Sequence, residues 1–120
     1  RLGAAYARLC TVEEALDSDP DGLSGTWESE NRAFHRTLIS NCGSDWLMRF
    51  VAVLSEQSER YRRQALALRA VPQETLLREH REIFDAAIER KAGLAVELLK
   101  LHIRNSANGL GQALFAAKAD

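Results

Sequence analysis

Residues 72–102 decide the fold, and they read PQETLLREHREIFDAAIERKAGLAVELLKLH. Apolar side chains recur here every three or four positions, which is the spacing of one face of a helix. Before the break at residues 91–93 they are Leu76, Leu77, Ile83, Phe84, Ala87 and Ile88, and after it Leu94, Leu98 and Leu101. Pro72 is suited to open the first helix. The stretch therefore predicts two amphipathic helices joined by a tight turn.

Helical spacing continues through most of the remaining sequence, and no segment alternates with the period of a strand. We expect further helices over about residues 2–17, 26–42 and 44–69. The stretch Ser18–Gly25 contains Pro and two Gly and predicts a break, so that the second helix begins near Thr26. Gly43 is placed to end that helix and Ser44 to cap the next. The sequence predicts an all-α fold, an antiparallel bundle of about five to six helices.

The third predicted helix carries a stripe that we expect to face the core. Its members are Leu47, Val51, Leu54, Ser58, Tyr61 and Ala65.

Composition limits the classes of protein to consider. The chain has 120 residues, 46% of them hydrophobic, and a net charge of −1. The length fits one compact domain over 1–120, and the charge argues against DNA binding by this segment alone.

No apolar run approaches the ~20 residues that span a bilayer, and no signal-peptide pattern opens the chain. Cys10 and Cys42 predict buried, reduced thiols in a cytoplasmic protein. Because the chain starts at Arg1 without Met, we expect a piece of something longer, with material missing on the N-terminal side.

Three histidines lie within predicted helices. His80 lies 11 residues before Lys91 and His102 lies 11 residues after it, so each is about 16 Å from the turn and the two imidazoles are level in a hairpin. Asn31 precedes His35 by one helical turn, which places both on one face. Side chains that converge from facing helices are how a bundle builds a metal site. The alternative for each histidine is a core residue with satisfied nitrogens.

Other polar residues are candidates for a ligand pocket. Ser58 interrupts the stripe of the third helix, and Arg62 follows one turn later. A guanidinium facing inward at that position would donate hydrogen bonds to a ligand carboxylate. Asn105, beyond His102, would orient an imidazole or meet a ligand. The alternatives are a solvent-facing Arg62, a backbone hydrogen bond from Ser58 and a helix-surface role for Asn105.

Four stretches together resemble a known family: Asn31-Arg-Ala-Phe34-His35-Arg-Thr-Leu38, Asp45-Trp-Leu47-Met, His80-Arg-Glu-Ile-Phe-Asp-Ala-Ala-Ile88, and His102. In order and spacing they are similar to the FCD domain, the FadR-type C-terminal ligand-binding domain of GntR-type transcription regulators. The resemblance runs from the first helix to about Leu110. It implies an all-helical bundle that follows an N-terminal winged helix-turn-helix, with that part and the first bundle helices outside this chain. It also implies a homodimer, DNA contact only through the missing domain, and a small organic acid or related metabolite as effector.

The resemblance further implies a divalent metal held by an aspartate and three histidines. His35, His80 and His102 match the histidines, whereas Asn31 stands at the aspartate position. An amide oxygen is a neutral and weaker ligand than a carboxylate, so the resemblance implies a weakened metal site. Three imidazoles suit zinc, nickel or iron(II).

Two other functions compete with an effector sensor. A metalloenzyme would use three histidines and an open coordination position to activate water. Against it, Glu79 and Glu82 fall on other faces of their helix than His80, and Asn31 cannot serve as a base. A purely structural dimerisation module would satisfy the histidines internally and bind neither metal nor ligand.

Overall fold

The computed structural model describes the backbone of residues 1–119 and the side chains of residues 1–116. It contains five α-helices, namely α1 (Leu2–Ala15), α2 (Pro20–Ile39), α3 (Asp45–Ala67), α4 (Gln73–Ile88) and α5 (Ala92–Ala119), with a short 3₁₀ turn at Leu16–Ser18. No strand occurs over the described residues, and the all-α prediction is confirmed. The chain forms two compact units, Arg1–Arg63 and Gln64–Asp120.

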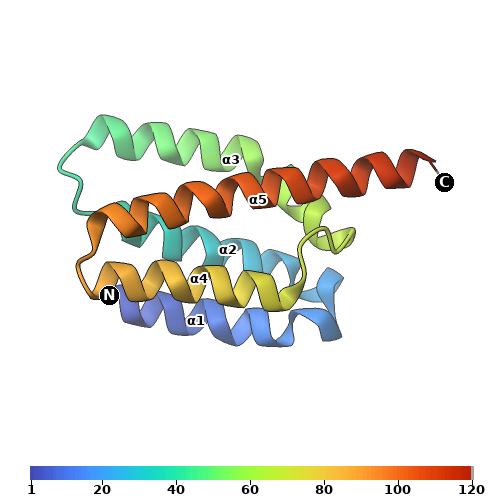
Figure 1. Ribbon diagram of the computed structural model, residues 1–120, viewed down its shortest axis with the longest axis horizontal. Coiled ribbons are helices and arrows are strands. Elements are labelled where there is room, and N and C mark those ends of the chain that lie inside the picture. The colour runs from blue at the N-terminus through green and yellow to red at the C-terminus, as the bar shows by residue number, and fades with distance from the viewer. Residues whose placement is uncertain (120) are drawn as a thin grey trace. The chain divides into compact units, whose positions relative to one another are not determined.

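The core of the first unit lies between α1 and α2, which run side by side (Figure 1). Leu9 and Phe34 are completely buried there, and the ring of Tyr6 lies 5.9 Å from that of Phe34. The indole N–H of Trp27 donates to the buried carboxylate of Glu13 at 3.0 Å. Apolar packing and one buried polar bond therefore join the two helices.

The start of α2 differs from the prediction, because the helix begins at Pro20 and not near Thr26. The carboxylate of Asp19 accepts a hydrogen bond from the backbone N–H of Gly22 at 3.1 Å, which is an N-cap, and Pro20 occupies the first helical position, where its missing N–H costs nothing. A Cβ on Gly22 would lie 2.0 Å from Asp19 Oδ2. The residues that predict a break are thus the residues that start the helix.

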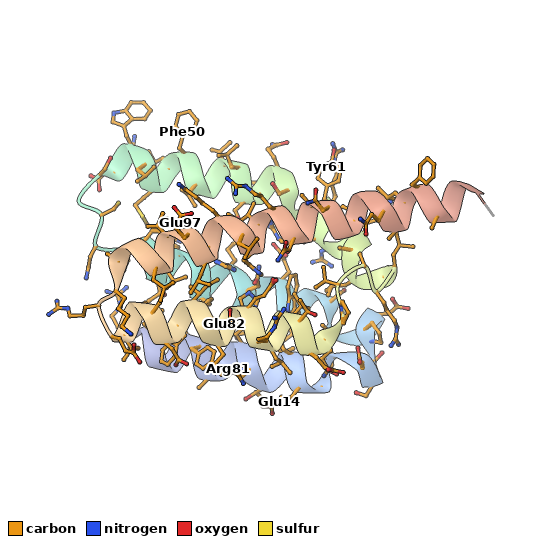
Figure 2. All side chains as sticks on the ribbon, viewed as in Figure 1. Glu14, Phe50, Tyr61, Arg81, Glu82 and Glu97 are labelled. Atoms are coloured by element: carbon orange, nitrogen blue, oxygen red, sulfur yellow. The ribbon has the colours of Figure 1, made fainter. Side chains whose placement is uncertain are left out.

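Helix α3 begins as predicted but does not bury the predicted stripe. Gly43 has φ 75°, and the Ser44 hydroxyl oxygen accepts from the N–H of Leu47 at 3.1 Å. Its members Leu47, Leu54 and Tyr61 nevertheless stay 48%, 58% and 46% exposed, and Figure 2 shows Tyr61, with Phe50 beside the stripe, projecting outward from the helix. The prediction of a core-facing stripe is therefore wrong, because ion pairs, and not the apolar stripe, join α3 to α2 in the first unit.

The second unit contains the α4–α5 hairpin, whose two helices run side by side in Figure 1. Leu76, Ile83 and Ala86 of α4 are buried. Arg90 takes the left-handed conformation at the turn, with φ 59°, and the N–H of Lys91 returns to the carbonyl of Ala86 at 2.9 Å. This closes α4 in the manner of a Schellman motif. The predicted hairpin is confirmed.

Cys10 is half-buried and Cys42 is exposed, so the prediction of two buried thiols is wrong for Cys42, which follows the end of α2 instead of packing in a core. Within residues 1–119, no helix combines the length and apolar character that crossing a bilayer demands.

Gly109 permits a close approach of α5 to the loop before α4. A Cβ there would lie 2.9 Å from the carbonyl oxygen of Ala70 and 3.2 Å from Cγ2 of Val71, whereas nothing lies within 4 Å of a Cβ on Gly111. The chain thus offers a glycine that packing requires and, two residues later, one that it does not.

We predict opposite effects of alanine at these two positions. Gly109→Ala should lower the melting temperature because the methyl group displaces the backbone of the 70–71 loop. Gly111→Ala should raise the free energy of unfolding by up to about 1 kcal/mol, since alanine favours a helix over glycine. Thermal melts followed by circular dichroism provide the measurement. Equal stabilisation by both substitutions would contradict the close approach.

Candidate functional site

His80 of α4 and His102 of α5 pack against each other in the second unit. Their ring centroids lie 4.6 Å apart with an interplanar angle of 63°, and the residues are 1% and 7% exposed. The matched distances from the turn place them level, as the spacing predicts. Two imidazoles from facing helices thus share one buried location.

A buried carboxylate fixes the orientation of His102. Oε1 of Glu79 lies 2.7 Å from His102 Nδ1, and the amide of Asn105 donates to Oε2 of Glu79 at 2.8 Å. An ionised carboxylate only accepts hydrogen bonds, so Nδ1 carries the proton and Nε2 is the nitrogen that can ligate. Asn105 holds the second oxygen, and Glu79 therefore has both of its oxygens engaged.

The role of Glu79 is what sequence reasoning missed. The sequence analysis sets Glu79 apart from the histidines because it assigns Glu79 to another face of the helix than His80. In the structure Glu79 reaches α5 and contacts His102. The signal is present in the spacing, because Glu79 lies 12 residues before Lys91 and His102 lies 11 residues after it. Residues at nearly equal distances from a hairpin turn lie at nearly equal heights.

The environment of His80 keeps its imidazole neutral. Burial lowers the pKa of His80 from 6.5 to about 3, and the neighbouring His102 adds to the lowering while Glu79 opposes it. Desolvation disfavours the charged form. A neutral imidazole is the form that binds a metal, so at pH 7 His80 is already in that form.

Asn31 and His35 lie one turn apart on α2, in the first unit. Asn31 is 7% exposed, and its Oδ1 has no hydrogen-bond partner among the described residues. His35 is half-buried, with its ring edge-on to Phe34 at 5.3 Å. A buried amide oxygen without a donor is costly, and an unmet acceptor of this kind suits a cation or a water molecule.

Arg62 and Ser58, the predicted ligand contacts on α3, already bond within the first unit. The Arg62 guanidinium donates from Nε and Nη2 to the buried Glu28 at 2.9 and 2.6 Å, and from Nη2 to the carbonyl of Ser55 at 2.6 Å. Ser58 donates to the carbonyl of Leu54 at 2.7 Å. The fork of Arg62 thus holds an internal carboxylate, and a ligand role for either residue stays a prediction.

A surface pocket of about 450 Å³ lies between α2 and α3 in the first unit. Its charged lining residues are Glu28, Arg32, Arg36, Glu59 and Arg63. They pair largely with one another, with Arg32 bonding to Glu59 at 2.9 Å and Arg63 to the same carboxylate at 3.0 Å. Because most of its charged side chains form ion pairs with one another, this pocket is a weaker candidate for binding an ionic ligand than the histidine pair.

The lowered pKa of His80 predicts acid sensitivity in the metal-free protein. The unfolded chain takes up this proton near pH 6.5 and the folded chain only near pH 3, so the stability from neutral His80 is complete above pH 6.5 and is lost as the pH falls toward 3. The free energy of unfolding should drop by about 2 kcal/mol between pH 7 and pH 5 from this group. Urea titrations with a chelator present, on the native protein and on His80→Leu, measure it. The same pH slope in both proteins would exclude this role for His80.

Comparisons with known proteins point to one family. Residues 2–105 match the FCD domain. The chain is 41% identical over 106 residues to an uncharacterized HTH-type transcriptional regulator, BphR, of Paraburkholderia xenovorans (strain LB400), covering 88% of this chain and 43% of that protein. It is 28% identical over 104 residues to the HTH-type transcriptional repressor GlaR of Escherichia coli (strain K12), covering 82% and 46%.

The chain therefore spans less than half the length of these curated relatives. No solved structure matches the chain with significant similarity. The family match extends over most of the residues, from the start of α1 to Asn105 on α5. The chain belongs to the FCD domain family.

Proposed function

We propose that this chain is the effector-sensing and dimerisation domain of a GntR-type transcription regulator. In this proposal His35, His80 and His102 hold a divalent metal, with Asn31 as a weak fourth ligand, and a small organic acid binds beside it. The observation that carries the proposal is the buried His80–His102 pair, in which Glu79 contacts Nδ1 of His102 and leaves Nε2 to ligate.

The chemistry of the donor set supports a metal. His80 is neutral at pH 7, and Asn31 presents a buried oxygen without a donor among the described residues. Imidazole nitrogens suit zinc, nickel and iron, and a three-histidine set leaves coordination positions open. When bound, the cation would supply the positive charge that attracts an effector carboxylate. Arg62, Ser58 and Asn105 stay candidate contacts for the rest of that ligand.

Sensing is favoured over catalysis by the hydrogen bonds of Glu79, the acid that contacts His102. Oε1 of Glu79 contacts His102 and Oε2 accepts from Asn105, so both oxygens are engaged by protein side chains, whereas a general base must reach the proton that it abstracts. The relatives are named as transcription regulators. We therefore propose a domain that performs no reaction.

Regulation would follow from differential binding. As a homodimer in the cytoplasm, the protein would contact DNA through a winged helix-turn-helix outside this chain. An effector that binds one dimer geometry more tightly shifts the population toward it. The net charge of −1 fits a domain that leaves DNA contact to another part of the protein.

The proposal predicts that metal and effector each stabilise the protein. Ni²⁺ should raise the melting temperature, and succinate, as a probe carboxylate, should raise it further only when Ni²⁺ is present. At a metal concentration of 100 times Kd the gain is about 2.7 kcal/mol. Differential scanning fluorimetry measures both shifts. His35→Ala, His80→Ala and His102→Ala should each remove them, while Arg81→Ala, an exposed neighbour of His80, should retain them.

If all three histidine variants kept the Ni²⁺ shift, the metal centre would be wrong. If the native protein gave no shift with metal or carboxylate, the purely structural module would be the better description.

Asn31→Asp should raise the affinity for metal and lower the stability of the metal-free protein. With the metal bound, the new carboxylate replaces a neutral ligand by an anion, and Ni²⁺ affinity should rise by about tenfold or more, since charge-assisted contacts are about twice as strong as neutral ones. Without metal, a buried carboxylate lacking a partner should lower the free energy of unfolding. Calorimetric titration and urea unfolding measure the two effects. Unchanged Ni²⁺ affinity would exclude Asn31 from the metal site.

A further inference from the structure

We infer that Glu79 is a positioning residue of the proposed metal centre, and that it supplies the negative charge that the ligands lack. This inference rests on the proposed function and deepens it. The proposed ligands, His35, His80, His102 and Asn31, are all neutral groups. A divalent cation held by them alone would be a buried charge without an anion, which is strongly unfavourable.

The buried acids of the described chain can be told apart by their partners. They are Glu13, Glu28 and Glu79. Glu13 accepts from the indole of Trp27, and Glu28 is matched by the guanidiniums of Arg32 and Arg62. Glu79 instead contacts a proposed metal ligand at 2.7 Å. It is therefore the buried carboxylate whose charge is available to the histidine site.

The contact also determines which nitrogen of His102 ligates. The carboxylate holds the proton on Nδ1 and so leaves the lone pair on Nε2. Asn105, three residues after His102 on α5, donates to the other oxygen at 2.8 Å, which stops the carboxylate from rotating away. A carboxylate that accepts from a ligating imidazole raises the basicity of the ligand, and losing such a partner lowers metal affinity by about 10- to 100-fold.

Glu79→Gln tests the charge with the shape retained. The glutamine carbonyl can still accept from His102 Nδ1, and the amide of Asn105 can turn so that its oxygen accepts from the new NH2 group. The orientation is thereby kept while the negative charge is lost. We expect Ni²⁺ affinity, measured by competition with a chromophoric chelator, to fall by about 10- to 100-fold. The matched control is Glu82→Gln, one turn further along α4 (labelled in Figure 2), which removes the same charge and should leave the affinity within about twofold. Equal losses in the two variants, or none in Glu79→Gln, would overturn the inference.

The tautomer of His102 gives a readout that needs no metal. In ¹⁵N-labelled, metal-free protein, long-range proton–nitrogen correlation spectra should show His102 protonated at Nδ1 in the native protein and in Glu79→Gln. Glu79→Ala should show a mixture of tautomers, because the acceptor is gone. A native His102 protonated only at Nε2 would overturn the inference.

The two readouts separate this inference from the proposed function. If the native protein and Glu79→Gln bind Ni²⁺ equally well, the inferred role of Glu79 is overturned while the proposed metal centre stands. A native protein with the Nδ1–H tautomer that binds no Ni²⁺ overturns the metal centre, and the charge role of Glu79 with it.

Discussion

A carboxylate buried between two helices needs hydrogen-bond donors. In the α4–α5 hairpin these donors come from α5, and they fix the orientation of the His102 imidazole. Glu79 is 8% exposed, and both of its oxygens are bonded to side chains of α5, His102 and Asn105. An unmet buried carboxylate costs several kcal/mol, so the register of α5 against α4 is tied to these two bonds. The imidazole of His102 is held beside that of His80 as a consequence.

This constraint connects the fold to the proposed sensor. The hairpin brings two histidines level, burial keeps His80 in its neutral form, and Glu79 leaves Nε2 of His102 able to ligate. On α2, Asn31 presents a buried oxygen with no donor among the described residues. In the proposed site the ligands are neutral, and the carboxylate of Glu79 is hydrogen-bonded to a ligand. Such a site binds a cation less tightly than one in which a carboxylate ligates the metal directly. We expect such a site to exchange its metal readily.

The sequence was sufficient for the features that depend on spacing. The hairpin and the equal heights of His80 and His102 follow from counting residues from the turn, and the Ser44 cap follows from local turn chemistry. The contact of Glu79 with His102 cannot be read from one helix, because it depends on which faces of α4 and α5 meet. The early start of α2 differs from the prediction because Pro20 and Gly22 favour either a break or an N-terminus, and the hydrogen bond from Gly22 to Asp19 decides between them. The sequence predicts a ligand for the guanidinium of Arg62 because its actual partner, the buried Glu28, lies 34 residues away and cannot be located from periodicity.

The most direct test of the central claim is anomalous diffraction at the nickel absorption edge from crystals grown with Ni²⁺. The account predicts one strong peak with nitrogen atoms of His35, His80 and His102 at about 2.1 Å, a distance typical of metal–imidazole bonds, and Nε2 as the ligating atom of His102. A peak away from these three histidines, or ligation of His102 through Nδ1, would contradict it.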